Sequence, residues 1–205
     1  MEFTSEEEEF LVRTTCWTIR RRLEGQPGPM AVQPINKEIL RPAGCFVSLH
    51  NRQNHALRGC IGRIDSASPL LETLINVAWG AAQDPRFTNQ PVTLAELSQL
   101  SVEISILGQL RPAATPLDFT PETDGIYLSI TGRTGVFLPQ VARETRWSKE
   151  QLLDRLCQEK IGLPANAWRH PTAKLFTYPT RIIGPVGFLA DVQMQPFSGP
   201  MPNTI

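Results

Sequence analysis

The sequence lacks the features that most directly name a chemistry or a partner. Its 205 residues include 20 Lys and Arg and 20 Asp and Glu, so the formal net charge is zero. Non-specific binding to a phosphate backbone usually needs a basic excess, and regulation through nucleic acid is therefore the weakest function class. No apolar run approaches the ~20 residues of a membrane-spanning helix, and the acidic start does not resemble a signal peptide. We expect a cytoplasmic protein that does not bind a membrane.

Motifs for metals, nucleotides and redox pairs are also missing. There is no G-x-G-x-x-G, no G-x-x-x-x-G-K-[ST] and no C-x-x-C, and the histidines lack the spacing of metal ligands. We therefore expect no metal and no bound cofactor. In a reducing compartment the cysteines are expected to be free thiols, although Cys45 and Cys60 are placed so that a hairpin could bring them together. The four cysteines are Cys16, Cys45, Cys60 and Cys157.

Apolar periodicity predicts hairpins and separate helices rather than a regular strand–helix alternation. Helices are expected over residues 5–23, over 70 to just before 84, after 93, and over 148–160. Strands are expected over residues 45–50, 56–61, 101–106, 125–130, 136–138 and 173–178, and residues 112–123 are expected to be loop. This order indicates an α+β fold of antiparallel sheets with packed helices.

Pairs of residues at capping-box spacing mark three of the expected helix starts. The pairs are Ser5 with Glu8, Thr93 with Glu96, and Ser148 with Gln151. Glycines, prolines and small residues dominate from residue 184 onward, which is typical of a partly flexible tail. The expected organisation is thus one domain over residues 5–183 followed by a tail over 184–205.

The most informative segment is Leu57-Arg58-Gly59-Cys60-Ile61-Gly62, which sets one thiol between two glycines in an apolar strand. Glycines allow a ligand or another backbone to come close. Strand alternation places Arg58 on the face of Cys60, and a guanidinium beside a thiol favours the reactive thiolate. Cys60 is therefore the candidate catalytic residue, weighed against a small buried core cysteine.

The surroundings of Cys60 remain open at this level. The register leaves Cys60 opposite either Cys45 or Phe46. His50 is a candidate base if the hairpin brings it near. Arg58 either binds an anion or forms a structural ion pair with Glu103 or Asp84.

These residues resemble the AMMECR family, called AmmeMemoRadiSam system protein A in prokaryotes. Besides the LRGCIG motif, the resemblance rests on Asp84-Pro85-Arg86-Phe87, on Glu103–Leu107, on Leu138-Pro139-Gln140, and on Trp147 with the segment 156–163. Together these motifs extend over residues 5–183. Ile161 and Ile182-Ile183 depart from the family pattern, which usually has alanine at the first position and an aromatic residue near the second.

The resemblance implies two unequal lobes with a cleft between them, and an association with a Memo-like protein and a radical SAM enzyme. It brings no assigned reaction. Asp84-Pro85-Arg86-Phe87 is then either the exit of a helix, with Phe87 as an anchor, or a polar part of the cleft. The candidate binding residues are Arg58, Gly59, Gly62, His50, Asp84 and Arg86.

Two function hypotheses follow. The first is an accessory protein that binds a partner or substrate around Cys60 and Arg58, because the chain has no complete set of nucleophile, base and orienting group. The second is a cysteine-dependent enzyme in which Cys60 is a nucleophile or thiol carrier and Asp84 or His50 manages protons.

Overall fold

The computed structural model describes residues 2–64 and 67–197. The chain divides into two compact units. The first comprises the chain up to Leu107 and from Arg181 onward, and the second comprises Gly108–Thr180. Each has a hydrophobic core of its own. The prediction of an α+β protein with antiparallel sheets and packed helices is confirmed.

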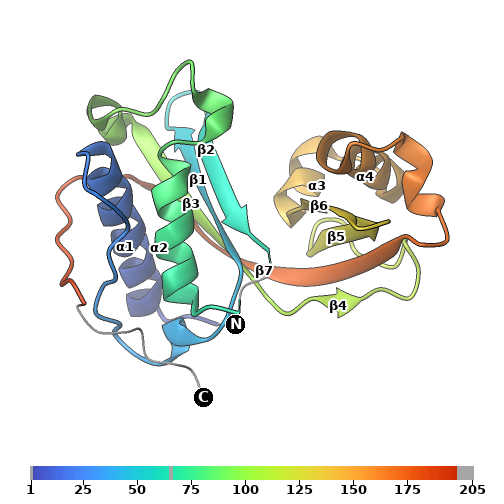
Figure 1. Cartoon of the computed structure of the whole chain (residues 1–205), viewed down its shortest axis with the longest axis horizontal. Coiled ribbons are helices and arrows are strands. Elements are labelled where there is room, and N and C mark those ends of the chain that lie inside the picture. Colours follow the sequence, from blue (N-terminus) through green and yellow to red (C-terminus); the bar gives the residue numbers. More distant parts are fainter. Residues whose placement is uncertain (1, 65–66, 198–205) are drawn as a thin grey trace. The chain divides into compact units, whose positions relative to one another are not determined.

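The sheet of the first unit places strand β1 (Cys45–Asn51) between β2 (Leu57–Arg63) and β3 (Leu100–Leu107). Both pairings are antiparallel. Helices α1 (Ser5–Leu23) and α2 (Leu70–Ala81) lie side by side against this sheet (Figure 1). Val47, Leu49 and Ile104 are among the residues buried between sheet and helices, which explains why these strands are apolar on alternate positions. Three short 3-10 helices complete the unit: η1 (Glu38–Leu40), η2 (Pro85–Phe87) and η3 (Leu94–Gln99).

The α1 capping box lies one residue earlier than expected. The backbone N–H of Glu7 donates to Thr4 Oγ1 (3.3 Å), and that of Thr4 donates to Glu7 Oε2 (2.7 Å), so the prediction of Ser5 with Glu8 is wrong. Both pairs have the right residue types. The pair of Thr4 with Glu7 is favoured over Ser5 with Glu8 because the side chain of Asn36, in a distant segment, donates to Glu7 Oε1 (2.7 Å).

The second unit combines a hairpin with a helical layer. Strand β5 (Asp124–Ile130) pairs with β6 (Arg133–Phe137) and with the first half of β7 (Lys174–Gly187), which also pairs with β4 (Arg111–Pro112). The helical segments are α3 (Pro139–Thr145), α4 (Lys149–Leu156), the π-helix η4 (Cys157–Ile161) and the 3-10 helix η5 (Ala165–Arg169). The expected capping box of Ser148 with Gln151 is confirmed at α4. Neither strand β4 nor helix α3 was expected, and Pro112 of β4 lies at the start of the predicted loop.

The C-terminal segment continues the fold beyond the expected start of the tail. Strand β7 runs to Gly187, and Phe188 and Val192 are buried in the core of the first unit. The remainder of the expected tail, residues 198–205, lies outside the described residues, so its flexibility stays a prediction. Among the described helices, none combines the length and apolar character needed to cross a membrane.

Candidate functional site

Cys60 lies in the middle of β2 and faces Ser48 of β1. The Ser48 hydroxyl donates to the Cys60 sulfur at 3.2 Å. The expected pairing with Cys45 or Phe46 is wrong, because β2 pairs with β1 from Leu57 opposite His50, and a register shift between Leu49 and His50 moves the later pairs by one further residue. All four cysteines are free, and Cys60 is half-buried whereas the other three are buried. Burial raises the pKa of the Cys16 thiol to about 11 and that of Cys45 above its usual range.

The backbone of Cys60 is held by two side chains from the DPRF segment. The Cys60 N–H donates to Asp84 Oδ2 at 2.8 Å, and Arg86 Nη2 donates to the Cys60 carbonyl at 2.9 Å. Asp84 and Arg86 also bind each other, with Nη2 2.6 Å from Oδ2. The resemblance implied that these residues approach Cys60, and the structure places them there. As the helix-exit interpretation expected, α2 ends at Ala81, before Asp84 and Pro85, but Phe87 is only partly buried and is not among the core residues. Asp84 caps the following η2 by accepting from the Arg86 N–H.

Arg86, rather than Arg58, is the guanidinium beside the Cys60 thiol. The pKa of Arg86 is raised, first by its hydrogen bond to Asp84 and further by its charge interaction and hydrogen bond with Cys60. Burial disfavours the charged form of Asp84, but hydrogen bonds from the Arg86 side chain and from the backbone outweigh this and hold its pKa below the usual value. Asp84 is therefore a carboxylate at neutral pH. Its side chain is 1% exposed, whereas that of Arg86 is 52% exposed.

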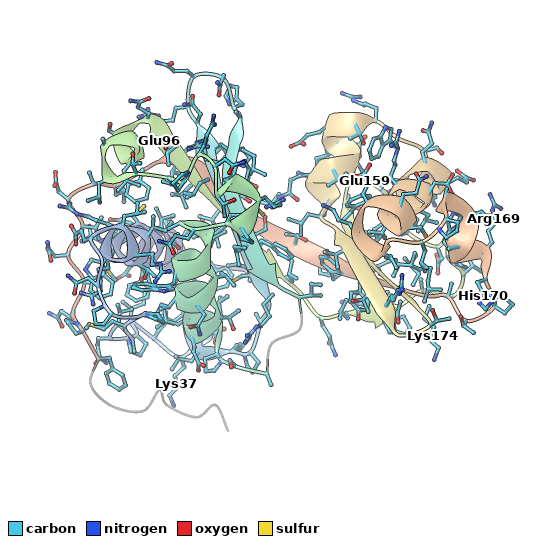
Figure 2. All side chains as sticks on the ribbon, turned by 45° about the horizontal axis from the view of Figure 1, so that its top comes forward. Lys37, Glu96, Glu159, Arg169, His170 and Lys174 are labelled. Carbon is cyan, nitrogen blue, oxygen red and sulfur yellow. The ribbon has the colours of Figure 1, made fainter. Side chains whose placement is uncertain are left out.

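Arg58 is committed to a different partner. Its Nε lies 2.5 Å and its Nη2 3.0 Å from the two carboxylate oxygens of Glu96, and Nη2 also donates to the Gln90 carbonyl. The expected ion pair with Glu103 or Asp84 is wrong. So is the expected capping role of Glu96, because Thr93 caps η3 without a side-chain hydrogen bond. Figure 2 shows Glu96 on the short helical segment that supplies this bidentate pair.

The two glycines of the motif have packing reasons. A Cβ at Gly59 would lie 2.3 Å from the carbonyl oxygen of Ala81, at the end of α2. A Cβ at Gly62 would lie 2.0 Å from the ring of Phe46, its cross-strand partner. The close approach that the glycines predicted is thus made by a helix carbonyl and an aromatic ring of the same unit.

The histidines do not assemble a base or a metal site in the structure. His50 Nδ1 is hydrogen-bonded to the His55 carbonyl at 3.3 Å. His170 is exposed on the second unit, with Nδ1 2.8 Å from the Thr172 hydroxyl (Figure 2). Within residues 2–64 and 67–197, no group of three His, Cys, Asp or Glu side chains is arranged to hold a metal ion.

Ser48 and Glu96 are site residues that sequence reasoning missed. Ser48 is polar at a position of β1 that is only 9% exposed, and a buried polar residue in an apolar strand is a signal that could have been used. Glu96 gave no such signal, because its spacing from Thr93 fitted a cap.

Comparison with known proteins places the chain in a family. The model of the AMMECR1 family matches residues 12–183. Protein MJ0810 of Methanocaldococcus jannaschii is 34% identical over 186 residues, which cover 87% of this chain and 90% of the relative. Protein Ta0236 of Thermoplasma acidophilum is 34% identical over 169 residues, covering 80% and 79%.

A solved structure shows the same fold. The uncharacterized protein PH0010 from Pyrococcus horikoshii matches with a TM-score of 0.80 and 31% identity, covering 96% of this chain and all of that one. The chain therefore belongs to the AMMECR1 family. The LRGCIG and DPRF segments that carried the resemblance both lie inside the matched residues.

Proposed function

We propose that this protein is an accessory component that binds a substrate or partner at the surface formed by Cys60 and Arg86. The observation that supports the proposal is the contrast in exposure at the site. Asp84 is buried and holds a guanidinium whose side chain is half exposed next to a half-buried thiol. Such a surface offers charged hydrogen-bond donors to a carboxylate, phosphate or carbonyl group.

The proposal changes the roles of the predicted binding residues. Arg58, with its guanidinium bound to Glu96 and Gln90, supports the loop beside the site, and Arg86 faces the ligand. Gly59 and Gly62 set the packing of β2, and His50 lies at the end of β1. The family resemblance supports an AmmeMemoRadiSam-type system, so the proposed partners are a Memo-like protein and a radical SAM enzyme. The cleft between lobes remains a prediction.

The experiment uses Cys60 as a chemical handle. The tagged protein is treated with N-ethylmaleimide and then used to capture the Memo-like and radical SAM proteins of its own organism. We expect untreated protein to capture at least one of them and alkylated protein to lose at least nine-tenths of that capture. Cys60→Ala is the matched control: treatment with the same reagent should leave its capture equal to that of untreated Cys60→Ala, because the remaining thiols are buried.

Two outcomes would contradict the proposal. Capture that survives complete alkylation of Cys60 would move the binding surface elsewhere. If the untreated protein captures neither partner, whether the tag is at its N-terminus or its C-terminus, the proposed association with these two proteins is contradicted.

The alternative is a cysteine-dependent enzyme, which the contact between Arg86 and the Cys60 thiol also favours. A catalytic thiolate should react with iodoacetamide below pH 8 in the folded protein, faster than Cys16, Cys45 and Cys157. Labelling of Cys60 only after denaturation would exclude this alternative. An activity that is lost in Cys60→Ala while partner capture persists would favour it over the binding role.

A further inference from the structure

Strand β2 lies at the end of the strand order, so within the described part of the chain one side of its backbone has no neighbouring strand. An unpaired strand edge offers a row of N–H and C=O groups that can pair with a strand of another molecule. In an antiparallel pair, both backbone groups of a residue point to the same side. The groups of Cys60 bind Asp84 and Arg86, so they point to the free side of β2.

Asp84 and Arg86 together offer the Cys60 backbone the same hydrogen-bond acceptor and donor that one residue of an adjacent strand would offer. The carboxylate accepts the Cys60 N–H at 2.8 Å, as a strand carbonyl would, and the guanidinium donates to the Cys60 carbonyl at 2.9 Å, as a strand N–H would. Their mutual bonds keep donor and acceptor side by side. One backbone position in the middle of the exposed edge is thereby occupied.

The arrangement is held in place more firmly than a surface ion pair. Asp84 is buried and also accepts from the Arg86 N–H at 3.0 Å, so it is fixed at the start of η2. The same chain segment also binds Arg58 of β2 through its side chain, because Gln90 and Glu96 hold the Arg58 guanidinium. The segment from Asp84 to Glu96 thus follows the edge from Cys60 to Arg58.

We propose that Asp84 and Arg86 form an edge guard that prevents β2 from pairing with β2 of a second copy of this chain. A second copy is the occupant that fits, because two identical edges can pair antiparallel about a two-fold axis. The motif supplies apolar and glycine positions, including Ile61 and Gly62, without a charge inside the strand between Gly59 and Gly62 to oppose such pairing. This role shares Cys60 and Arg86 with the proposed binding surface, but its test measures the association of this chain alone, so the failure of one proposal does not decide the other.

The test measures self-association by analytical ultracentrifugation between about 1 and 200 μM. Removing both groups in Asp84→Ala/Arg86→Ala should strengthen self-association at least tenfold over the wild-type protein. Adding Cys60→Pro should reverse this, because proline removes the N–H that a second strand needs. Adding Cys60→Ala instead removes only the thiol and should leave the association in place. Arg41→Ala, which breaks the exposed Arg41–Glu38 pair, is the control for loss of an arginine.

A second measurement applies if the double variant does not fold. In hydrogen exchange on the wild-type protein, the Cys60 amide should exchange at least tenfold more slowly than that of Gly62, which also points to the free side. Arg86→Ala removes only one of the two groups, and it should narrow the difference in exchange rate between the Cys60 and Gly62 amides. Equal exchange of the two amides, or a folded double variant that sediments like wild type, would overturn the proposal. Association that Cys60→Pro does not relieve would place the contact away from this edge.

Discussion

At the scale of single residues, the LRGCIG motif is best understood through what each side chain contacts. Gly59 gives room to the Ala81 carbonyl and Gly62 gives room to the Phe46 ring. Arg58 ties β2 to the loop through Glu96, and Cys60 is joined to Asp84 and Arg86 by its backbone. The two glycines and Arg58 are therefore explained by packing and hydrogen bonding, whereas these contacts do not explain why position 60 carries a thiol.

Gly59→Ala should destabilise the protein by about 2 kcal/mol or more, because the new Cβ meets a backbone oxygen that cannot move freely. Urea unfolding measures the change in the free energy of unfolding. Gly28→Ala is the matched control, since a Cβ there meets nothing within 4 Å, and it should change stability by less than about 1 kcal/mol. Equal effects of the two substitutions would show that α2 does not press on β2 at Gly59.

Arg58→Ala should cost about 2 kcal/mol, because it leaves the Glu96 carboxylate in a mostly buried position without its partner. The side chains of the pair are only 16% and 19% exposed. Arg41→Ala provides the comparison, since its pair with Glu38 is about half exposed and should contribute about 0.5 kcal/mol. A double-mutant cycle with Glu96→Ala isolates the pair. A coupling energy near zero would contradict a structural role for Arg58.

At the scale of elements, helices and hairpins were predicted best where the signal was local. The helices α1 and α2, the Ser148 cap and both hairpins follow from periodicity and from turn residues. The register of β1 with β2 did not, because the hairpin pairs His50 with Leu57 and one irregular position at Leu49 and His50 then shifts every later pair. Position 60 was identified from the sequence, and Asp84 and Arg86 from the family resemblance, whereas Ser48 was missed.

Thr4→Ala should lower the free energy of unfolding by about 1 kcal/mol, because it removes the acceptor of the Glu7 N–H at the start of α1. Ser5→Ala should have an effect below about 0.5 kcal/mol, since Ser5 is the first residue of the helix rather than its cap. Thermal or urea unfolding of the two variants compares them directly. The reverse order would restore Ser5 as the capping residue.

At the scale of the whole molecule, two separate hydrophobic cores and one long strand shared by both units define the architecture. The candidate site belongs entirely to the first unit, because β1, β2 and the DPRF segment all precede Leu107. Two carboxylates of the first unit, Asp84 at the site and Glu7 in α1, have pKa values that are lowered in the folded state. This gives the molecule a defined response to acid.

Stability should fall as pH is lowered through the acidic range. A carboxyl whose pKa is lower in the folded state stabilises the protein above the pKa of the unfolded chain, and this contribution is lost as protons bind at lower pH. For Asp84 the ordinary value is 3.8, so the difference in stability between wild type and Asp84→Asn should be constant from pH 7 to about 5 and shrink below about 4. Urea unfolding of both proteins at several pH values measures this difference in stability. A stability difference that grows on acidification would show that folding raises the pKa of Asp84 instead of lowering it.

By itself, the sequence determined the fold class, the main helices and hairpins and the family, and it predicted that the candidate site lies around Cys60. These depend on periodicity, capping and motifs, which act between residues close in the chain. Only the tertiary structure decided that Arg86 and not Arg58 adjoins the thiol, that Arg58 pairs with Glu96, and that Asp84 binds the Cys60 backbone. Each of these contacts joins residues at least 24 positions apart. Charge and side-chain type permit several such partners, and packing selects one.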